Sequence, residues 1–353
     1  MAGQASRLTA TYLKSGDGYH QRGLRFNQSV GQYMKGSLPE IANYMEVRHG
    51  DWIGEGVIEF AFQEKQSLKD GDSAGVACGL LLESLVTGTR MDEKFACTGA
   101  LNVDGSVQPI GGVVAKLRGA HKVGCELVAI PFANRYALSD LTVLGEASIL
   151  AKMQVFVVKE FEGALALARE DRTEEVESAL TKFSGLQAQF AKEGVMNVLR
   201  TKEAQATLQE VLAAIPDHAS ARLMLSAAQG RLPKRLSLNG SMEEIGAALF
   251  EVFELVNPPP NLQPLLGAPL ADFEATEKAM QKLVPKLEPR TQPIGTAMLQ
   301  FSKACTAFRA APRSDAAKRQ QAYRQIRVSF ERILTEMDKI ADDPELIEDL
   351  IKL

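Results

Sequence analysis

The sequence predicts an α+β domain in the first half of the chain and an all-helical region in the second half. Up to about residue 170, short runs of strand-forming residues alternate with helical patterns, an arrangement typical of α/β and α+β domains. Beyond Arg172 the strand signals disappear, and apolar residues recur at helical spacing. With 353 residues, of which 45% are hydrophobic, the chain is long enough for two or three domains and a sizeable core.

The elements of the first half are predicted from runs of β-branched and aromatic residues and from the glycines that separate them. Strands are expected at 56–62, at 125–131, at 153–159, and on either side of Asp104-Gly105, a favourable hairpin dipeptide. A buried helix is expected from Ser73 to about Val86, a short one at 111–124 opened by two glycines, and a third at 160–170.

Two amphipathic segments follow, at 173–194 and 201–233. In the second, a Pro-Asp turn separates two helices that carry small residues where they cross, which resembles one tetratricopeptide-like unit. Arrays of such units need about three repeats to be stable, so one unit does not establish a repeat fold. The proline-rich stretch 257–269 predicts a linker or an ordered loop.

Three helices are expected beyond this stretch, near 270–286, 294–311 and 314–341. The last carries an apolar seam with alternating spacings of three and four residues, made of Tyr323, Ile326, Phe330, Ile333, Met337 and Ile340. Such a seam packs inside a bundle or, as the alternative, between subunits. The expected organisation is a domain at 1–170, a helical, tetratricopeptide-like region at 171–256, the linker at 257–269 and a helical bundle at 270–353.

Composition excludes several classes of function. The net charge of −4 gives no basic surface for nucleic acid, and the basic stretch 313–327 is interleaved with other residues, as on a solvated helix face. The four cysteines lie far apart without a C-x-x-C pair, so we expect no zinc site, no other metal or cofactor, and no disulfide framework. No stretch approaches the roughly 18 apolar residues of a membrane helix, nor is there the apolar run of a signal peptide. We therefore expect a cytoplasmic protein without membrane or nucleic-acid partners.

The stretch KDGDSAG, 69–75, surrounds Ser73 with charge directly before the buried helix. A serine hydroxyl attacks a carbonyl only when a base removes its proton. None of the four histidines accompanies a G-x-S-x-G motif, and no serine has a lysine three positions later. The remaining candidate is a serine–lysine dyad, whose lysine must lose its proton although free lysine titrates near about 10.4.

Lys116 is the candidate base because it lies in the apolar segment PIGGVVAKLRGA. Burial disfavours an ammonium group and brings a lysine pKa down to about 7–8 in known active sites. The alternative is that the side chain of Lys116 extends from its short helix into water. A helix that begins at Ser73 would direct the backbone N–H groups of Ser73 and Ala74 at an oxyanion.

These motifs, KDGDSAG followed by CTGALNVDGSVQPIGGVVAKLRGAHKVGCELVAIP, closely resemble the proteolytic domain of the Lon protease family. The resemblance runs from about Val57 to Glu170 and implies that Ser73 is the nucleophile and Lys116 its base. It also implies a polypeptide substrate and a ring-like homo-oligomer.

The resemblance extends to the neighbours of the dyad. Thr98 matches the family threonine beside the lysine and is expected to orient the amine, or simply to fill a strand. Asp72 stands where relatives have Pro or Asp, Asp70 is expected to cap the turn, and His121 is expected to serve packing.

The sequence departs from the family pattern at two positions that bear on activity. Ala100 replaces the usual glutamate of T-G-E, and no Gly-Lys dipeptide is present, so this chain holds no G-x-x-x-x-G-K-[ST] nucleotide loop. We therefore expect an ATP-independent serine endopeptidase whose C-terminal helices recruit a protein partner or substrate. The alternatives are a catalytically inactive scaffold of Lon-type fold and an esterase or self-cleaving regulator that uses the same dyad.

Overall fold

The computed structural model describes residues 5–14, 22–64, 69–254, 265 and 267–351. They divide into two compact units, one holding residues up to Thr142 together with Glu146–Leu232, the other holding Val143–Gly145 and Pro233–Leu353. Each unit is described by itself.

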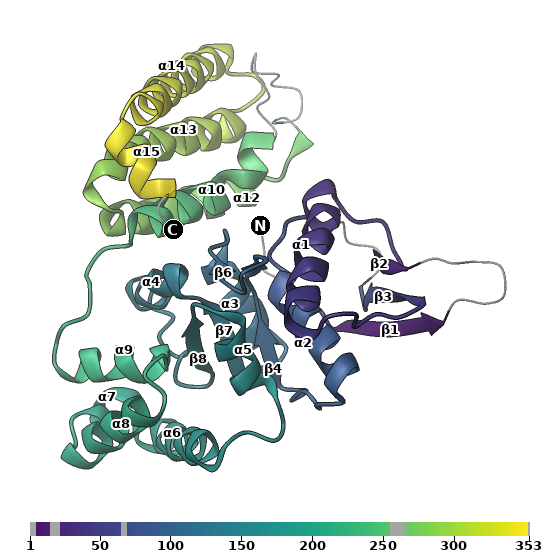
Figure 1. The fold of residues 1–353 in the computed structure, drawn as a ribbon. Helices are drawn as coiled ribbons and strands as arrows, with labels where there is room; N and C mark the ends of the chain where they lie inside the picture. The colour runs from purple at the N-terminus through teal and green to yellow at the C-terminus, as the bar shows by residue number, and fades with distance from the viewer. Residues whose placement is uncertain (1–4, 15–21, 65–68, 255–264, 266, 352–353) are drawn as a thin grey trace. The chain divides into compact units, whose positions relative to one another are not determined.

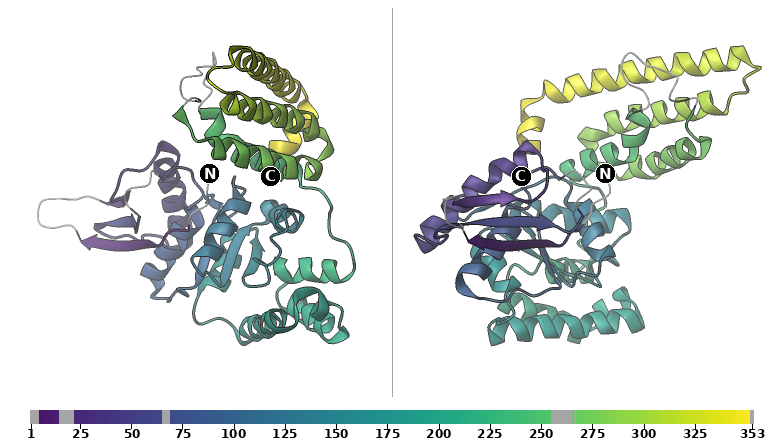
Figure 2. Two further views of the ribbon diagram at one scale, coloured as in Figure 1. Left: turned by 180° about the vertical axis from the view of Figure 1, so that it is seen from behind. Right: turned by 90° about the vertical axis from the view of Figure 1, so that its right-hand side faces the viewer.

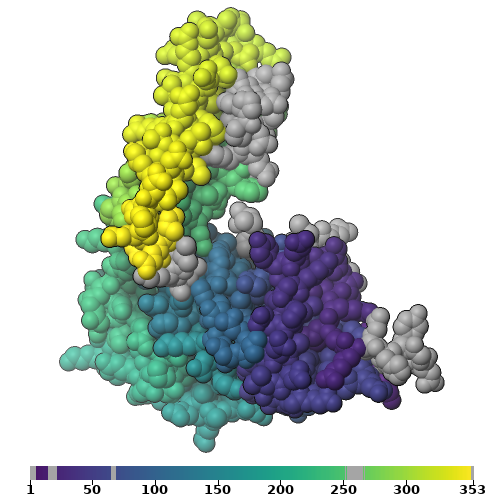
Figure 3. Space-filling model, turned by 45° about the horizontal axis from the view of Figure 1, so that its top comes forward, coloured from purple at the N-terminus to yellow at the C-terminus, as the bar shows by residue number. Residues whose placement is uncertain are grey.

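The first unit begins with a three-stranded sheet in the order β1-β3-β2. The central strand β3 (Gly56–Phe62) pairs antiparallel with β1 (Leu8–Lys14) and parallel with β2 (Gly23–Phe26), as Figure 1 shows. Every second residue of β3 is buried, so one face of this sheet belongs to the core. Helix α1 (Gln32–His49) follows β2, and these N-terminal elements, purple in Figure 3, form one continuous surface with the blue elements after them.

A second, parallel sheet has the order β4-β7-β8. Its strands are β4 (Phe95–Cys97), β7 (Leu127–Pro131) and β8 (Gln154–Val158). All residues of β7 and β8 are buried, which explains why β7 is an unbroken apolar run and why β8 is apolar after Gln154. The hairpin of β5 (Ala100–Leu101) and β6 (Val107–Gln108) turns at Gly105, which has a φ of 84°.

The strands predicted at 56–62, 125–131 and 153–159 are confirmed as β3, β7 and β8, the last two being slightly shorter than expected, and the hairpin at Asp104-Gly105 is confirmed as well. The helices α3 (Val113–Lys122) and α5 (Phe161–Ala168) are confirmed as well. Helix α2 spans Gly75–Thr87 and so begins two residues after the expected start, because the Gly75 N–H closes a turn onto the Asp72 carbonyl. The sequence analysis did not predict four of the observed elements, which are β1, β2, α1 and α4 (Tyr136–Leu144).

Four helices of the same unit follow the sheet, and the turn between the last two covers an edge of β8. They are α6 (Glu174–Glu193), α7 (Val195–Leu199), α8 (Lys202–Ala214) and α9 (Ala219–Ala228). The Val157 N–H donates to the Asp217 carbonyl over 3.0 Å, and the Val155 N–H donates to the Ser220 hydroxyl over 2.9 Å. A strand edge with unpaired N–H groups must be covered or paired, and this turn does both.

His218 completes this junction. Its fully buried ring lies 4.6 Å from the Phe156 ring and 4.4 Å from the Phe183 ring, measured between centroids. The Gln154 amide oxygen lies 3.0 Å from Nε2 of His218, and the Ala221 N–H donates to Nδ1. The predicted helix, Pro-Asp turn and second helix are therefore present, and they are joined to the sheet domain.

The compact units divide the chain differently from the expected segments 1–170 and 171–256. Contacts such as those of His218 place α6–α9 with the sheets, and the division falls at Leu232/Pro233. Helix α10 (Leu238–Glu254) then belongs with the C-terminal helices. The expected linker 257–269 lies mostly outside the described residues.

The C-terminal unit is helical, with α12 (Leu270–Leu283), α13 (Gln292–Ala310), α14 (Ala316–Ala341) and α15 (Pro344–Ile351). The long helix α14 is continuous in both views of Figure 2. Of the predicted seam, Ile326, Phe330 and Ile333 are buried in one cluster with Phe301 and Phe308 of α13, so this part packs within the bundle. Met337, at the far end of the seam, is 48% exposed.

None of the helices built by the described residues combines the length and the apolar composition that crossing a membrane demands.

Candidate active site

Ser73 is partly buried in the turn directly before α2, and Ala74 is the N-cap residue of that helix. The turn is closed by the hydrogen bond from the Gly75 N–H to the Asp72 carbonyl, 2.9 Å long. The helix that follows is one of the most apolar in the chain, with Val76 and Leu82 fully buried. The serine is thus fixed between the solvent-facing loop and the core.

The main chain of Ser73 is held by the residues that follow β4. The Thr98 hydroxyl donates to the Ser73 carbonyl over 3.1 Å, and the Gly99 N–H donates to the same oxygen over 2.9 Å. Thr98 is in turn tied to the sheet, because its N–H donates to the Ala129 carbonyl of β7. The structure therefore places Thr98 against the main chain of Ser73, and the expected hydrogen bond between Thr98 and the Lys116 amine stays a prediction.

Two glycines permit this close approach. A Cβ atom on Gly75 would lie 2.8 Å from the Leu101 backbone nitrogen, and one on Gly99 would lie 2.7 Å from a methyl carbon of Val107. Real side chains essentially never come this close, so larger residues would push the turn away from β5.

Some of the backbone N–H groups around Ser73 donate hydrogen bonds within the structure, and others do not. The N–H of Gly75 donates to Asp72, and that of Val76 donates to the Gly99 carbonyl over 3.1 Å. Those of Ser73 and Ala74 donate to no acceptor among the described residues. Both lie at the positive end of the α2 dipole, so this turn offers two donors to a negatively charged oxygen.

Lys116 lies in the first turn of α3 and is partly buried. Its neighbours Val113, Val114 and Leu117 are almost completely buried, with exposed fractions of 0%, 1% and 1%. Gly112 begins the helix in the left-handed conformation, with a φ of 70°, which explains the glycine that opens this helix.

Asn134 fixes the segment before α3 and was missed by the sequence patterns. It is fully buried, accepts a hydrogen bond from the Ile110 N–H over 3.0 Å and donates one to the Ile110 carbonyl over 2.9 Å. An asparagine that pairs with both backbone groups of one distant residue has no local signature, because the pairing arises only in the folded chain.

The two aspartates before the serine have different surroundings. One carboxylate oxygen of Asp70 accepts hydrogen bonds from the Gly71 N–H over 2.8 Å and from the Met34 N–H over 3.2 Å. Asp70 therefore caps its own turn and also the first turn of α1. The Asp72 side chain is exposed, and His121 lies in the last turn of α3.

A network of charged residues joins α1, α2 and α5 and was also not identified from the sequence. Glu83 of α2 is only 4% exposed and accepts hydrogen bonds from Arg48 over 2.8 Å, while Nε2 of His49 lies 2.7 Å from it. Arg48 also pairs with Glu162. Burial acts to raise the pKa of Glu83, but the bonds from Arg48 and His49 outweigh it, and the pKa is lowered.

The cysteines beside the site are not alternative nucleophiles. Burial raises the pKa of the Cys97 thiol to about 12 and that of Cys78 further still, so both thiols stay protonated at neutral pH. Among the residues that the structure describes, no three His, Cys, Asp or Glu side chains cluster closely enough to hold a metal ion.

Comparison with known proteins identifies the first part of the chain. Residues 26–170 match the family described as Lon protease (S16) C-terminal proteolytic domain. The Lon proteases of Escherichia coli K12 and Erwinia amylovora are 31% and 32% identical over 151 residues, which is 41% of this chain and 19% of each relative. That of Clostridium beijerinckii is 47% identical over 73 residues, 21% of this chain and 9% of the relative. Residues 26–170 therefore form a Lon-type proteolytic domain, and the chain spans at most about a fifth of the length of these relatives.

Proposed function

We propose that this chain is an ATP-independent serine endopeptidase in which Ser73 is the nucleophile and Lys116 the general base. The Lon-type domain at 26–170 supports peptide-bond hydrolysis as the reaction class. The absence of a Gly-Lys dipeptide supports action without an ATPase module in this polypeptide.

The mechanism assigns each proton to a group. The neutral amine of Lys116 accepts the Ser73 hydroxyl proton as Oγ forms a bond to the peptide carbonyl carbon. The carbonyl oxygen becomes an oxyanion that accepts hydrogen bonds from the Ser73 and Ala74 N–H groups. The amine of the scissile bond leaves with the proton from Lys116. Water then hydrolyses the acyl-enzyme, with Lys116 again acting as the base.

One observation carries this proposal. The Thr98 hydroxyl and the Gly99 N–H both bind the Ser73 carbonyl, which fixes the turn while leaving the N–H groups of Ser73 and Ala74 without an acceptor among the described residues. A partly buried turn that satisfies its carbonyl and leaves two N–H groups at a helix start is suited to binding an oxyanion. The apolar residues on either side of Lys116 favour the neutral amine that the reaction requires.

In this proposal the supporting residues hold the serine turn and the lysine amine in position. Thr98 holds the serine main chain, and the lone pairs of its hydroxyl oxygen can accept a hydrogen bond from the Lys116 amine. Asp70 keeps the serine turn against α1, while Asp72 faces the substrate side. The C-terminal helices recruit a protein partner or substrate, and the Lon-type domain assembles as a homo-oligomer in the cytoplasm.

The test compares cleavage of casein and of an unfolded peptide by purified variants. Ser73→Ala and Lys116→Met each abolish cleavage while thermal unfolding stays unchanged, whereas Ser84→Ala, at a partly buried serine on α2, keeps the parent rate. If the parent chain cleaves neither substrate, the inactive scaffold is the better account. If Ser73→Ala cleaves at the parent rate, Ser73 is not the nucleophile.

A further inference from the structure

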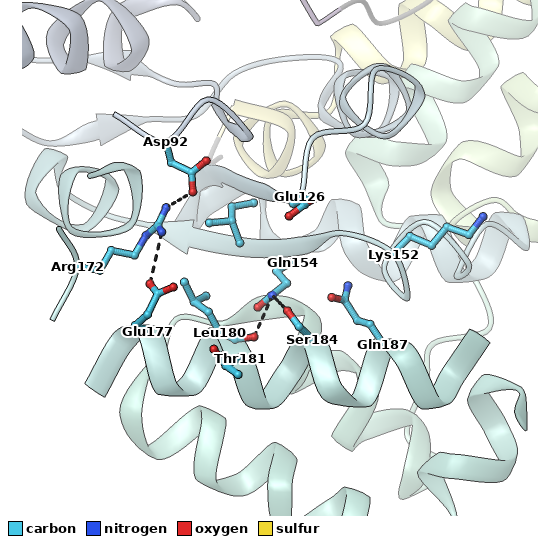
Figure 4. Close-up of a pocket in the computed structure, with 11 residues that line it drawn as sticks. Asp92, Glu126, Lys152, Gln154, Arg172, Glu177, Leu180, Thr181, Ser184 and Gln187 are labelled. Carbon is cyan, nitrogen blue, oxygen red and sulfur yellow. Dashed lines mark hydrogen bonds and ion pairs between the residues drawn. The ribbon is translucent and has the colours of Figure 1, made fainter. Parts of the chain in front are cut away.

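A polar cleft lies at the opposite end of the parallel sheet from Ser73. Thr98 follows the carboxyl end of β4 and holds the serine turn there, whereas Asp92, Glu126 and Gln154 lie before or at the start of β4, β7 and β8. Between these residues and helix α6 the structure leaves a cleft of about 470 Å³, shown in Figure 4. Clefts of this size hold small molecules or short peptides.

At one end of the cleft the charged groups are already paired. Arg172, whose side chain is 7% exposed, donates to Asp92 over 2.5 Å and to the Leu167 carbonyl over 2.8 Å, and it lies 3.5 Å from Glu177. Glu177 is 57% exposed and has this long ion pair only among the described residues. The Glu177 carboxylate at this end can therefore form an ion pair with a further positively charged group.

The other end of the cleft presents hydrogen-bond donors, and the Glu126 carboxylate near them is already paired with Lys94 over 2.5 Å. Nε2 of Gln187 is buried and has no hydrogen-bond partner among the described residues, which costs about 1–3 kcal/mol unless a ligand or solvent fills the position. The Ser184 hydroxyl accepts a bond from Gln154 over 3.1 Å, which leaves its own proton to donate. Lys152 stands at the rim beyond Gln187 with its amine extended away from the cleft, and no ion pair of the described residues holds it there. These three groups favour an anionic oxygen.

The floor of the cleft indicates which side chain the ligand presents there, and the length of the cleft indicates how many residues the ligand has. Leu127 and Leu180, exposed by 6% and 5%, lie between the two ends. Glu177 and Gln187 are ten residues apart on α6, which is about 15 Å along a helix. An extended peptide covers about 3.4 Å per residue, so about four residues span this distance.

We propose that this cleft binds a peptide segment of about four residues that ends in a free carboxylate. The carboxylate lies at Gln187, Ser184 and Lys152, an aliphatic side chain covers Leu127 and Leu180, and the amino end lies toward Glu177. The segment is either a free short peptide or the C-terminal tail of a longer polypeptide, since both present the same carboxylate. Binding here does not depend on the peptidase activity proposed above.

The experiment is a calorimetric titration of the full chain carrying Ser73→Ala, so that the probe remains intact. The probe is the tetrapeptide Ala-Leu-Ala-Leu with free ends, compared with its C-terminal amide and its N-acetyl form. Gln187→Leu and Lys152→Met test the carboxylate end, and Gln189→Leu, an exposed residue on the same helix, is the matched control.

The free tetrapeptide binds, its amide binds about tenfold more weakly or worse, and Gln187→Leu weakens binding by a similar factor while Gln189→Leu does not. Lys152→Met, on the sheet side, weakens binding without touching α6. If N-acetylation weakens binding, the ligand is a free short peptide, and if it does not, the ligand is a polypeptide tail. Equal binding of acid and amide, no change in either carboxylate-end variant, or no binding at millimolar peptide overturns the proposal.

Discussion

The Thr98 hydroxyl lies 3.1 Å from the Ser73 carbonyl oxygen and donates a hydrogen bond to it. The Gly99 N–H binds the same oxygen, and the Thr98 N–H binds the sheet through Ala129. The main chain of the serine is therefore fixed directly by the end of β4. Its reactive side chain is positioned through this backbone, which makes the neighbours of Ser73 as informative to test as Ser73 itself.

Thr98→Val removes the hydroxyl and keeps the shape of the side chain. One of two hydrogen bonds to the Ser73 carbonyl is lost, so we expect the free energy of unfolding to fall by about 1 kcal/mol. We expect a large fall in the rate of peptide cleavage and a small change in the affinity for substrate. The substitution disturbs the serine turn and leaves the contacts to the substrate in place. Steady-state kinetics measure both, and Thr98→Ser restores the hydroxyl and most of the rate. A variant with Val that cleaves at the parent rate would show that this hydrogen bond is unimportant.

Gly75→Ala introduces a methyl group where the Leu101 backbone nitrogen lies 2.8 Å away. Because backbone cannot rotate aside, the start of α2 must shift, and we expect a loss of about 1–3 kcal/mol in stability together with most of the cleavage activity. Chemical denaturation and a peptide assay check the two effects.

The matched control is Gly185→Ala on α6, where an added Cβ meets no atom within 4 Å. Alanine in a helix interior is favoured over glycine by about 0.5–1 kcal/mol, so this variant is slightly more stable than the parent. The steric argument fails if both substitutions change stability in the same direction.

His218 predicts a pH-dependent stability. Burial lowers the pKa of its ring to about 3, and the ring is neutral in the folded chain, with Nδ1 accepting from the Ala221 N–H. The unfolded chain has a histidine pKa near about 6.5 and so binds an additional proton below that value. The stabilisation is complete above pH 6.5 and is lost as the pH falls from about 6.5 toward 3, by about 1.4 kcal/mol per pH unit.

The measurement is the free energy of unfolding at pH 7, 6 and 5 for the parent and for His218→Asn. Asparagine can still cap α9, but it does not titrate. The variant is less stable at pH 7, since it loses the ring packed between Phe156 and Phe183, and its stability falls less steeply on acidification. Parallel pH profiles would mean that the ring of His218 is not buried in the neutral form.

Glu83→Gln tests the network that joins α1, α2 and α5. The amide loses the charge-assisted bonds to Arg48 and His49 inside a site that is 4% exposed, so we expect a loss of about 2 kcal/mol at pH 7. The lowered pKa of Glu83 means that its contribution is present above the ordinary carboxyl pKa of about 4.3 and is lost below it. The difference between parent and variant therefore shrinks as the pH falls below about 4. A difference that stays constant to pH 3 would contradict this account.

Sequence patterns were sufficient for elements that are buried along their whole length and for turns that only certain residues can form. The strand β7 is buried along its whole length and appears as an unbroken apolar run, and Asp104-Gly105 marks a hairpin because only a few residues adopt its turn. The motif around Lys116 placed that residue on the predicted short helix, whereas Ser73 lies in the turn before α2 rather than at the first position of the helix. Their geometry relative to one another stays a prediction.

Features that depend on distant partners could not be found in this way. Asn134 binds Ile110, Glu83 binds Arg48, and the turn at Asp217 covers β8, and each pairing joins residues more than 20 positions apart. The helix α1 was not predicted, because its buried residues are interrupted by Pro39 and its apolar face is weak. The start of α2 was misplaced by two residues because hydrogen bonding in the turn, rather than apolar periodicity, determines where a helix begins.

Covalent labelling with a serine-directed peptidyl phosphonate, followed by mass spectrometry of the digested chain, tests the central claim most directly. Our account predicts a single modified residue, Ser73, in the parent chain, and no adduct after either Ser73→Ala or Lys116→Met, with both variants folded as judged by circular dichroism. An adduct on a different residue, or undiminished labelling of Ser73 in the Lys116→Met chain, would contradict it.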